Sequence, residues 1–207
     1  MAASVVLVHG LRTSATMWRA QQAVLRAADV PVTAVDLPGH GRRMAQRFRL
    51  DDALQCIDDA VTALPRPVVL VGLSLGGYLA LHYAGGVGRD RVDGVLAAAC
   101  GTAPGPANLG LYAAVAATIR RLPDRGAALN QRMIDLMVPP AGRADVIAGG
   151  VALDVMADAL GQLRALRPLS EILCLRRRAT GKGSAFPQGL KRRGGRLRTT
   201  VAAGPPD

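Results

Sequence analysis

A serine flanked by glycines stands between an apolar run and a helical pattern. The segment is Gly72-Leu73-Ser74-Leu75-Gly76-Gly77, after residues 68–71 and at the start of residues 75–84. On a sharp strand-to-helix turn, a serine hydroxyl is raised above the sheet, and the small glycines avoid clashes with the neighbouring strand and helix. The first N–H groups of the helix can stabilise an oxyanion. The pattern predicts Ser74 as a nucleophile and the N–H of Leu75 as an oxyanion donor.

A second short motif ends the first apolar run of the chain. It reads Val8-His9-Gly10-Leu11. A loop at this place can supply a second main-chain N–H to an oxyanion, so we expect the N–H of Leu11 to act together with that of Leu75. The side chain of His9 is predicted to be a turn residue that is hydrogen-bonded to the backbone.

A third motif, Asp36-Leu37-Pro38-Gly39-His40-Gly41-Arg42, follows the second apolar run. Glycine and proline fix a tight loop there. Asp36 and His40 are residue types that could form a catalytic pair. They lie in one loop, however, and after the wrong strand for the usual geometry of such a pair. We therefore expect both to be structural.

The elements that position these motifs alternate along the chain. Apolar runs at 4–8, 31–35, 68–71 and 92–99 predict strands, and their continuous rather than alternating apolar character is typical of strands buried on both faces of a parallel sheet. Helical patterns at 16–28, 50–64 and 75–84 lie between them. This alternation predicts right-handed βαβ units in a doubly wound α/β sheet. Residues 105–167 are alanine-rich and broken by prolines and glycines, which predicts a small helical insertion.

The positive charge of the chain is concentrated at one end. The net charge is +11 over 207 residues, but residues 176–207 carry nine Lys or Arg against one acid, which leaves +3 for the rest. This basic segment contains six glycines and three prolines and has no helix or strand period. We expect it to be disordered and residues 1–175 to form the folded core.

Composition excludes several classes of protein. No uncharged apolar run is long enough for a transmembrane helix, and no signal peptide is recognisable at the N-terminus. Three scattered cysteines form neither a disulfide framework nor a zinc pattern, which favours a cytoplasmic protein. We expect no cofactor, because no dinucleotide fingerprint, metal-ligand cluster or complete phosphate loop is present.

In their order and spacing, the three motifs resemble the α/β-hydrolase superfamily, in particular its small esterase, lactonase and haloperoxidase-like branch. The similarity covers residues 4–100 well, and residues 105–167 resemble the helical cap of that family in placement. The resemblance implies that Ser74 attacks an ester, thioester or lactone carbonyl. The Ala, Leu, Val and Met side chains of the cap suggest a small apolar acyl substrate.

Members of this family complete a triad with a late acid and a late histidine, and here the sequence departs. Its histidines are His9, His40 and His82, all upstream of the expected cap. His82 lies eight residues beyond Ser74, or roughly 12 Å along the same helix, and is expected to be a packed helix residue. Glu171 is a weak candidate for the acid, and Asp207 is the only later one. We therefore expect weak hydrolysis or none.

Two explanations of the basic segment stay open. It could be a functional arm for nucleic acid or an anionic membrane, but it has one Phe for stacking and no amphipathic period. We favour the second explanation, in which the final strands are missing because residues from about 174 follow a frameshift or a truncating change. Translation of the other two frames downstream of codon 172 tests this: if neither frame encodes a strand, an Asp loop and a late His, the frameshift is excluded.

These observations leave three functional hypotheses. The first is a serine hydrolase of the α/β-hydrolase type that is impaired by the missing histidine and acid. The second is a catalytically silent protein that uses the same fold to bind a ligand. The third is a nucleic-acid binder acting through the basic segment, although we expect only non-specific contacts from that segment.

Overall fold

Four parallel strands form the sheet on which the described part of the chain is built. The computed structural model describes residues 3–100, 110, 114–115, 117–119, 121–153, 155–163 and 166. The strands are β1 (Ser4–Val8), β2 (Val32–Val35), β3 (Val68–Leu73) and β4 (Gly94–Ala98). Their order across the sheet is β2-β1-β3-β4, and all neighbours pair in parallel. The predicted α/β class with a parallel sheet is confirmed.

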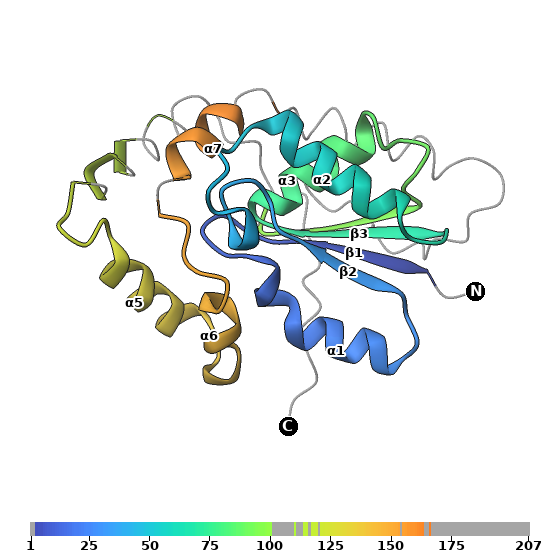
Figure 1. Cartoon of the computed structure of the whole chain (residues 1–207), viewed down its shortest axis with the longest axis horizontal. Helices are drawn as coiled ribbons and strands as arrows, with labels where there is room; N and C mark the ends of the chain where they lie inside the picture. The colour runs from blue at the N-terminus through green and yellow to red at the C-terminus, as the bar shows by residue number, and fades with distance from the viewer. Residues whose placement is uncertain are drawn as a thin grey trace, which may run out of the picture.

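Helices connect the strands as the alternating pattern predicted. After the 3-10 turn η1 (Ala15–Trp18), helix α1 (Arg19–Ala27) leads to β2, α2 (Leu50–Thr62) leads to β3, and α3 (Leu75–Gly85) leads to β4. Figure 1 shows α1 on one face of the sheet and α2 with α3 on the other. The expected single helix 16–28 is divided, because the Ser14 hydroxyl accepts a hydrogen bond from the N–H of Thr16 and caps a separate turn.

The strand order changes direction at one point of the sheet, between β1 and β3. From β1 the chain moves to β2 on one side, and from β3 it moves to β4 on the other side. The loops after β1 and β3 therefore leave the sheet toward opposite faces. In open α/β sheets, ligands bind at such a switch point, beyond the carboxyl ends of the strands. The motifs of Gly10 and Ser74 follow β1 and β3 and so meet there.

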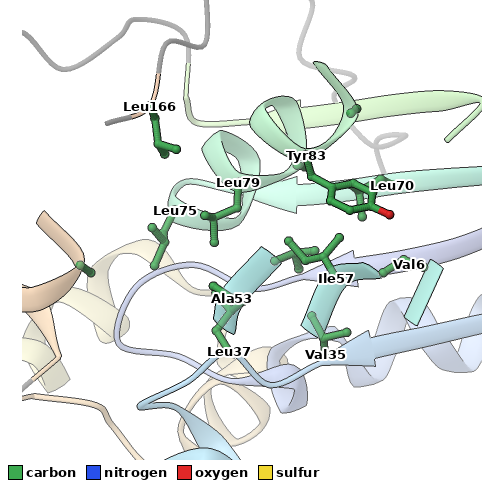
Figure 2. Packing of buried hydrophobic residues seen from close by; sticks show 14 of the residues in the cluster. Val6, Val35, Leu37, Ala53, Ile57, Leu70, Leu75, Leu79, Tyr83 and Leu166 are labelled. Carbon is green, nitrogen blue, oxygen red and sulfur yellow. The ribbon is translucent and has the colours of Figure 1, made fainter. Parts of the chain in front are cut away.

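The core lies between the sheet and the pair α2 and α3. Helix α2 turns Ala53, Ile57 and Val61 inward, at the four-residue spacing of one helical face. Helix α3 is apolar around most of its circumference and buries Leu75, Leu79 and Tyr83 among others, because it packs on the sheet and also against α2 beside it. In Figure 2, Ala53 and Ile57 of α2 and the three named side chains of α3 lie against those of Val6, Val35 and Leu70 from the strands.

The expectation that every strand is buried on both faces is wrong for β4. Its residues are half-buried, and the side chain of Leu96 is 57% exposed. Helix α3 packs against β4, but β4 is the edge of the sheet within the described residues and pairs only with β3 there. The apolar side chains of β4 are therefore only partly covered by other described residues.

The described residues between 127 and 163 of the expected insertion form three helices. They are α5 (Ala127–Met137), α6 (Pro140–Ile147) and α7 (Met156–Leu163), and Figure 1 shows α5 and α6 beyond one end of the strands. Pro140 starts α6, a position where its missing N–H costs nothing. The predicted breaks at Pro139-Pro140 and Gly149-Gly150 thus separate the helices. None of the helices in the described ranges is long and apolar enough to cross a membrane.

Helix α6 packs against η1, next to the loop that follows β1. The Thr16 hydroxyl donates a hydrogen bond of 2.6 Å to the carbonyl oxygen of Asp145, and Arg19 pairs with the Asp145 carboxylate at 3.1 Å. These contacts join the insertion to the chain segment that begins at Gly10. The division into a core of 1–175 and a tail of 176–207 remains a prediction, because the tail lies outside the described residues.

Candidate active site

Ser74 stands at the turn between β3 and α3 in a strained conformation. Its φ and ψ are 51° and −113°, in a region that non-glycine residues rarely adopt. Its N–H donates to the carbonyl of Ala98 at 2.8 Å, and its carbonyl accepts from the N–H of Tyr78 at 3.0 Å. These bonds hold the residue between the strand and the helix. Ser74 itself is half-buried.

The glycines around Ser74 are required by main-chain contacts. A Cβ on Gly72 would lie 2.2 Å from the carbonyl oxygen of Gly76, and a Cβ on Gly76 would lie 2.3 Å from that of Val8. A Cβ on Gly77 would lie 2.7 Å from the Sγ of Cys100. The first two of these contacts are with main-chain atoms, which a rotamer change cannot relieve. The sequence-based argument for small residues therefore has a direct steric cause.

The loop after β1 passes beside Ser74. A Cβ built on Gly10 would lie 3.7 Å from the Cβ of Ser74. The N–H of Leu75 is the first of α3 and has no partner inside the helix. In the following loop the N–H of Arg12 donates to the Nε2 of His40 and that of Thr13 to the carbonyl of Gly10. The structure therefore places the loop that contains Leu11 beside Ser74, which Leu75 follows directly in the chain, and the role of Leu11 and Leu75 as oxyanion donors remains a prediction.

His9 is fully buried and both of its ring nitrogens are occupied. Nδ1 lies 2.8 Å from the carbonyl oxygen of Gly10, and Nε2 accepts from the N–H of Leu37 at 3.0 Å. This pattern requires the neutral ring with its proton on Nδ1. Burial, followed by the nearby His40, lowers the pKa of His9 to about 4. The side chain thus joins the loops after β1 and β2, as a turn residue rather than a base.

His40 and Asp36 fix the same loop from the other side. The Nδ1 of His40 donates to the carbonyl of Pro38 at 2.9 Å, which leaves Nε2 to accept from the N–H of Arg12 at 3.3 Å. The carboxylate of Asp36 accepts from the N–H of Ala15 at 2.8 Å. Burial raises the pKa of Asp36, but bonds from Ala15 and Arg42 outweigh it and leave the pKa lowered. Both residues are thus structural, and they hold the backbone that precedes and follows Arg12.

The contact between these loops could not be read from the sequence. The rings of His9 and His40 lie with centroids 4.8 Å apart, although 31 positions separate them along the chain. Gly41, with a φ of 52°, has no room for a Cβ because the Asp36 carboxylate oxygen would be 2.2 Å away. The feature of the sequence that hints at this contact is a His-Gly dipeptide after each of the first two strands.

No histidine of the sequence lies beside Ser74 as a base. His9 and His40 are bonded into the loops described above, and His82 is half-buried in the second half of α3. The other residues considered for the acid and the next strand, Glu171, Asp207 and 172–175, lie outside the described residues. Within the described ranges, no group of three metal-ligating side chains is present.

A hollow of about 310 Å³ lies away from these residues. Arg47, Leu50 and Asp158 are among its lining residues, between the start of α2 and α7. The guanidinium of Arg47 forms two hydrogen bonds with the Asp158 carboxylate, so an ion pair is part of the lining of this hollow. Ser74 does not line it. The turn that carries Ser74 at residues 72–77, which we call the elbow, and its position at the switch point of the sheet locate the candidate site better than this hollow does.

Known proteins are similar to this chain in sequence family and in fold. The model of the Alpha/beta hydrolase family matches residues 5–200 of the chain. The crystal structure of E-2-(acetamidomethylene)succinate hydrolase aligns over 84% of this chain and 69% of its own, with 19% identity and a TM-score of 0.58. NosK from Streptomyces actuosus aligns over 83% and 72%, with 24% identity and a TM-score of 0.56. At these identities the two structures show the fold alone. No curated protein matched the chain.

The strain at Ser74 leads to a first prediction. Ser74→Gly and Ser74→Ala both remove the hydroxyl, but only the glycine variant removes the Cβ that makes φ = 51° unfavourable. We expect Ser74→Gly to be more stable than Ser74→Ala by about 1 kcal/mol. Urea unfolding of the two variants measures the difference. Equal free energies of unfolding would show that the elbow stores no strain.

The buried His9 leads to a second prediction. Its folded-state pKa of about 4 lies below the ordinary 6.5, so between these values the unfolded chain binds a proton that the folded chain does not. The free energy of unfolding should therefore fall as the pH falls, by about 2 kcal/mol from pH 7 to 4.5. The lowered pKa of His40 acts in the same direction, whereas Asp36 acts below this window.

Urea unfolding at the two pH values provides the measurement. His9→Asn keeps a donor and an acceptor but does not titrate, so its loss of stability over the same interval should be clearly smaller. An identical loss in the wild type and in His9→Asn would contradict the assignment of this pH dependence to His9.

Proposed function

Because the chain belongs to the alpha/beta hydrolase family, we propose that it is a serine hydrolase whose Ser74 is acylated by a carboxylic ester or a related acyl substrate. The observation that carries this proposal is the elbow itself. Ser74 combines a positive φ with glycines that main-chain contacts require, at the switch point of the sheet. A fold maintains such strain where a side chain must be presented to a ligand.

In the proposed reaction, the Oγ of Ser74 forms a bond to the carbonyl carbon of the substrate. The negative charge that develops on the carbonyl oxygen is stabilised by the N–H groups of Leu11 and Leu75. Both donors are held in place before the substrate arrives, the first by the loop that His9 and His40 bond and the second by α3. Such preorganised donors contribute about 3 kcal/mol of transition-state stabilisation each. The hydroxyl proton of Ser74 passes to solvent water, the bond between the carbonyl carbon and the leaving oxygen or sulfur breaks, and the leaving group takes up a proton from solvent. Water then attacks the acyl-serine and releases the acid and free Ser74.

We further propose that this chain turns over slowly. A hydroxyl needs a base to accept its proton, and the histidines at positions 9 and 40 keep their nitrogens bonded elsewhere. Without a base, oxyanion stabilisation and substrate binding remain, and these supply a residual acceleration of about 10³–10⁴ over water in enzymes that lack a triad member. A serine without a general base can therefore attack activated esters, because these have good leaving groups.

A catalytically silent ligand-binding protein is the second candidate. The observation that favours it is the same occupation of the histidine nitrogens, because a site that binds acyl groups needs oxyanion donors but no base. The apolar side chains of the insertion suit a small apolar acyl group in either case. The two candidates differ in whether Ser74 reacts.

Hydrolysis of p-nitrophenyl acetate provides the third prediction. We expect release of p-nitrophenol above the buffer rate and its loss in Ser74→Ala. The matched control is Thr62→Ala, which removes an exposed hydroxyl at the end of α2 and should leave the rate unchanged. Covalent labelling by a fluorophosphonate tests the same nucleophile without requiring turnover. The label is detected as an added mass on the peptide that contains Ser74.

The outcomes separate the candidates. Equal rates and equal labelling in the wild type and Ser74→Ala would exclude Ser74 as the nucleophile and favour the silent binder. A Ser74-dependent kcat at the level of an intact triad, about 10 per second or more, would contradict the proposed impairment.

A further inference from the structure

Arg12 follows the proposed oxyanion donor Leu11 and is held in a fixed, uncommon conformation. Its φ is 67°, in the left-handed region, and its N–H donates to the Nε2 of His40. A non-glycine residue in this region costs about 1 kcal/mol or more, which the surrounding bonds must offset. The loop therefore sets the direction in which the Arg12 side chain leaves the backbone.

The guanidinium of Arg12 is partly buried and has no counter-charge. Its Nε is inaccessible to solvent and makes no hydrogen bond. No carboxylate lies within ion-pair distance of it among the described residues, whereas Arg42, Arg66 and Arg91 pair with aspartates at more exposed positions. Burial lowers the pKa of Arg12, with no neighbouring charge acting against it. A partly buried charge without a partner lacks part of its hydration, and a bound anion would offset that cost.

The side chain extends from the loop beside Ser74 toward the insertion. Its terminal NH2 group lies 4.0 Å from where a Cβ of Gly126 would be, at the N-terminal end of α5. The backbone of Gly10, two residues before Arg12 in the chain, passes beside the Cβ of Ser74. Arg12 therefore extends from the loop that passes beside Ser74 to the N-terminal end of α5.

We propose that Arg12 binds an anionic group, a carboxylate, on the substrate whose carbonyl Ser74 attacks. This inference rests on the proposed function and adds to it a substrate class: esters, thioesters or lactones whose acyl part carries a second carboxylate. The planar guanidinium can form two parallel hydrogen bonds to such a group through its two terminal nitrogens, because its Nε is inaccessible to solvent. Arg12 then acts as a specificity-determining residue, and the apolar side chains of the insertion contact the carbon chain.

Binding of acids, rather than catalysis, tests this inference and gives the fourth prediction. The probes are glutarate and pentanoate, which have the same carbon chain and differ by one carboxylate. Calorimetric titration should show that the wild type binds glutarate at least about tenfold more tightly than pentanoate, as expected for a charge-assisted bond. Arg12→Met keeps an unbranched side chain without the charge and should lose this preference.

Two further variants make the test specific. Arg132→Met removes an exposed arginine from α5 and should keep the preference for glutarate, which excludes an effect of net charge alone. Arg12→Lys keeps the charge without the planar fork and should retain only part of the preference. Far-UV circular dichroism confirms that each variant is folded, and the comparison of the two acids in the wild type needs no variant.

The results that would overturn the inference are equal affinities of the wild type for the two acids, no binding of either, or an unchanged preference in Arg12→Met. Ser74→Ala separates this inference from the proposed function, because it should still prefer glutarate. A preference for glutarate that depends on Arg12, together with ester hydrolysis that is independent of Ser74, would disprove the nucleophile and leave the anion site intact.

Discussion

The first turn of α3 lies against the main chain of β1, and the rest of the site depends on this approach. Gly76 faces the carbonyl oxygens of Val8 and His9 at distances that no Cβ could occupy. Because the helix can come this close, the chain must turn sharply after β3, and Ser74 takes up the positive φ that the turn requires. The same contact brings the end of β1, and with it Gly10, beside Ser74. One main-chain contact thus aligns the nucleophile with its proposed oxyanion loop.

The loop after β1 is kept rigid by buried polar groups rather than by apolar packing. His9 and His40 are both neutral, and each donates through Nδ1 to a carbonyl and accepts through Nε2 from an N–H. Satisfied buried groups of this kind specify one backbone conformation, because any other conformation leaves a donor or acceptor unpaired. The same bonds explain why these histidines cannot serve Ser74: a ring that holds the loop has no nitrogen left for a proton from the nucleophile.

The charges around the site are distributed unevenly. Several aspartates of the folded part pair with arginines near the surface, as Asp58 does with Arg91 and Asp93 with Arg66. Arg12, by contrast, is partly buried and has no such partner in the part of the chain that the structure describes. In the proposed reaction, the loop after β1 therefore has two separate roles. The N–H of Leu11 faces the reacting carbonyl, and the side chain of Arg12 selects the group at the other end of the acyl chain.

The sequence by itself determined the order of the elements and the position of the elbow. The apolar runs that became β1 to β4, the helical patterns between them and the glycines around Ser74 are all local features, and local features are what residue spacing records. Only the tertiary structure decided that β4 is half-exposed, that His9 meets His40, and that Arg12 extends toward Gly126 without a partner. These facts depend on distances between segments far apart in the chain. Such distances are set by how the strands order themselves in the sheet, which no short stretch of sequence contains.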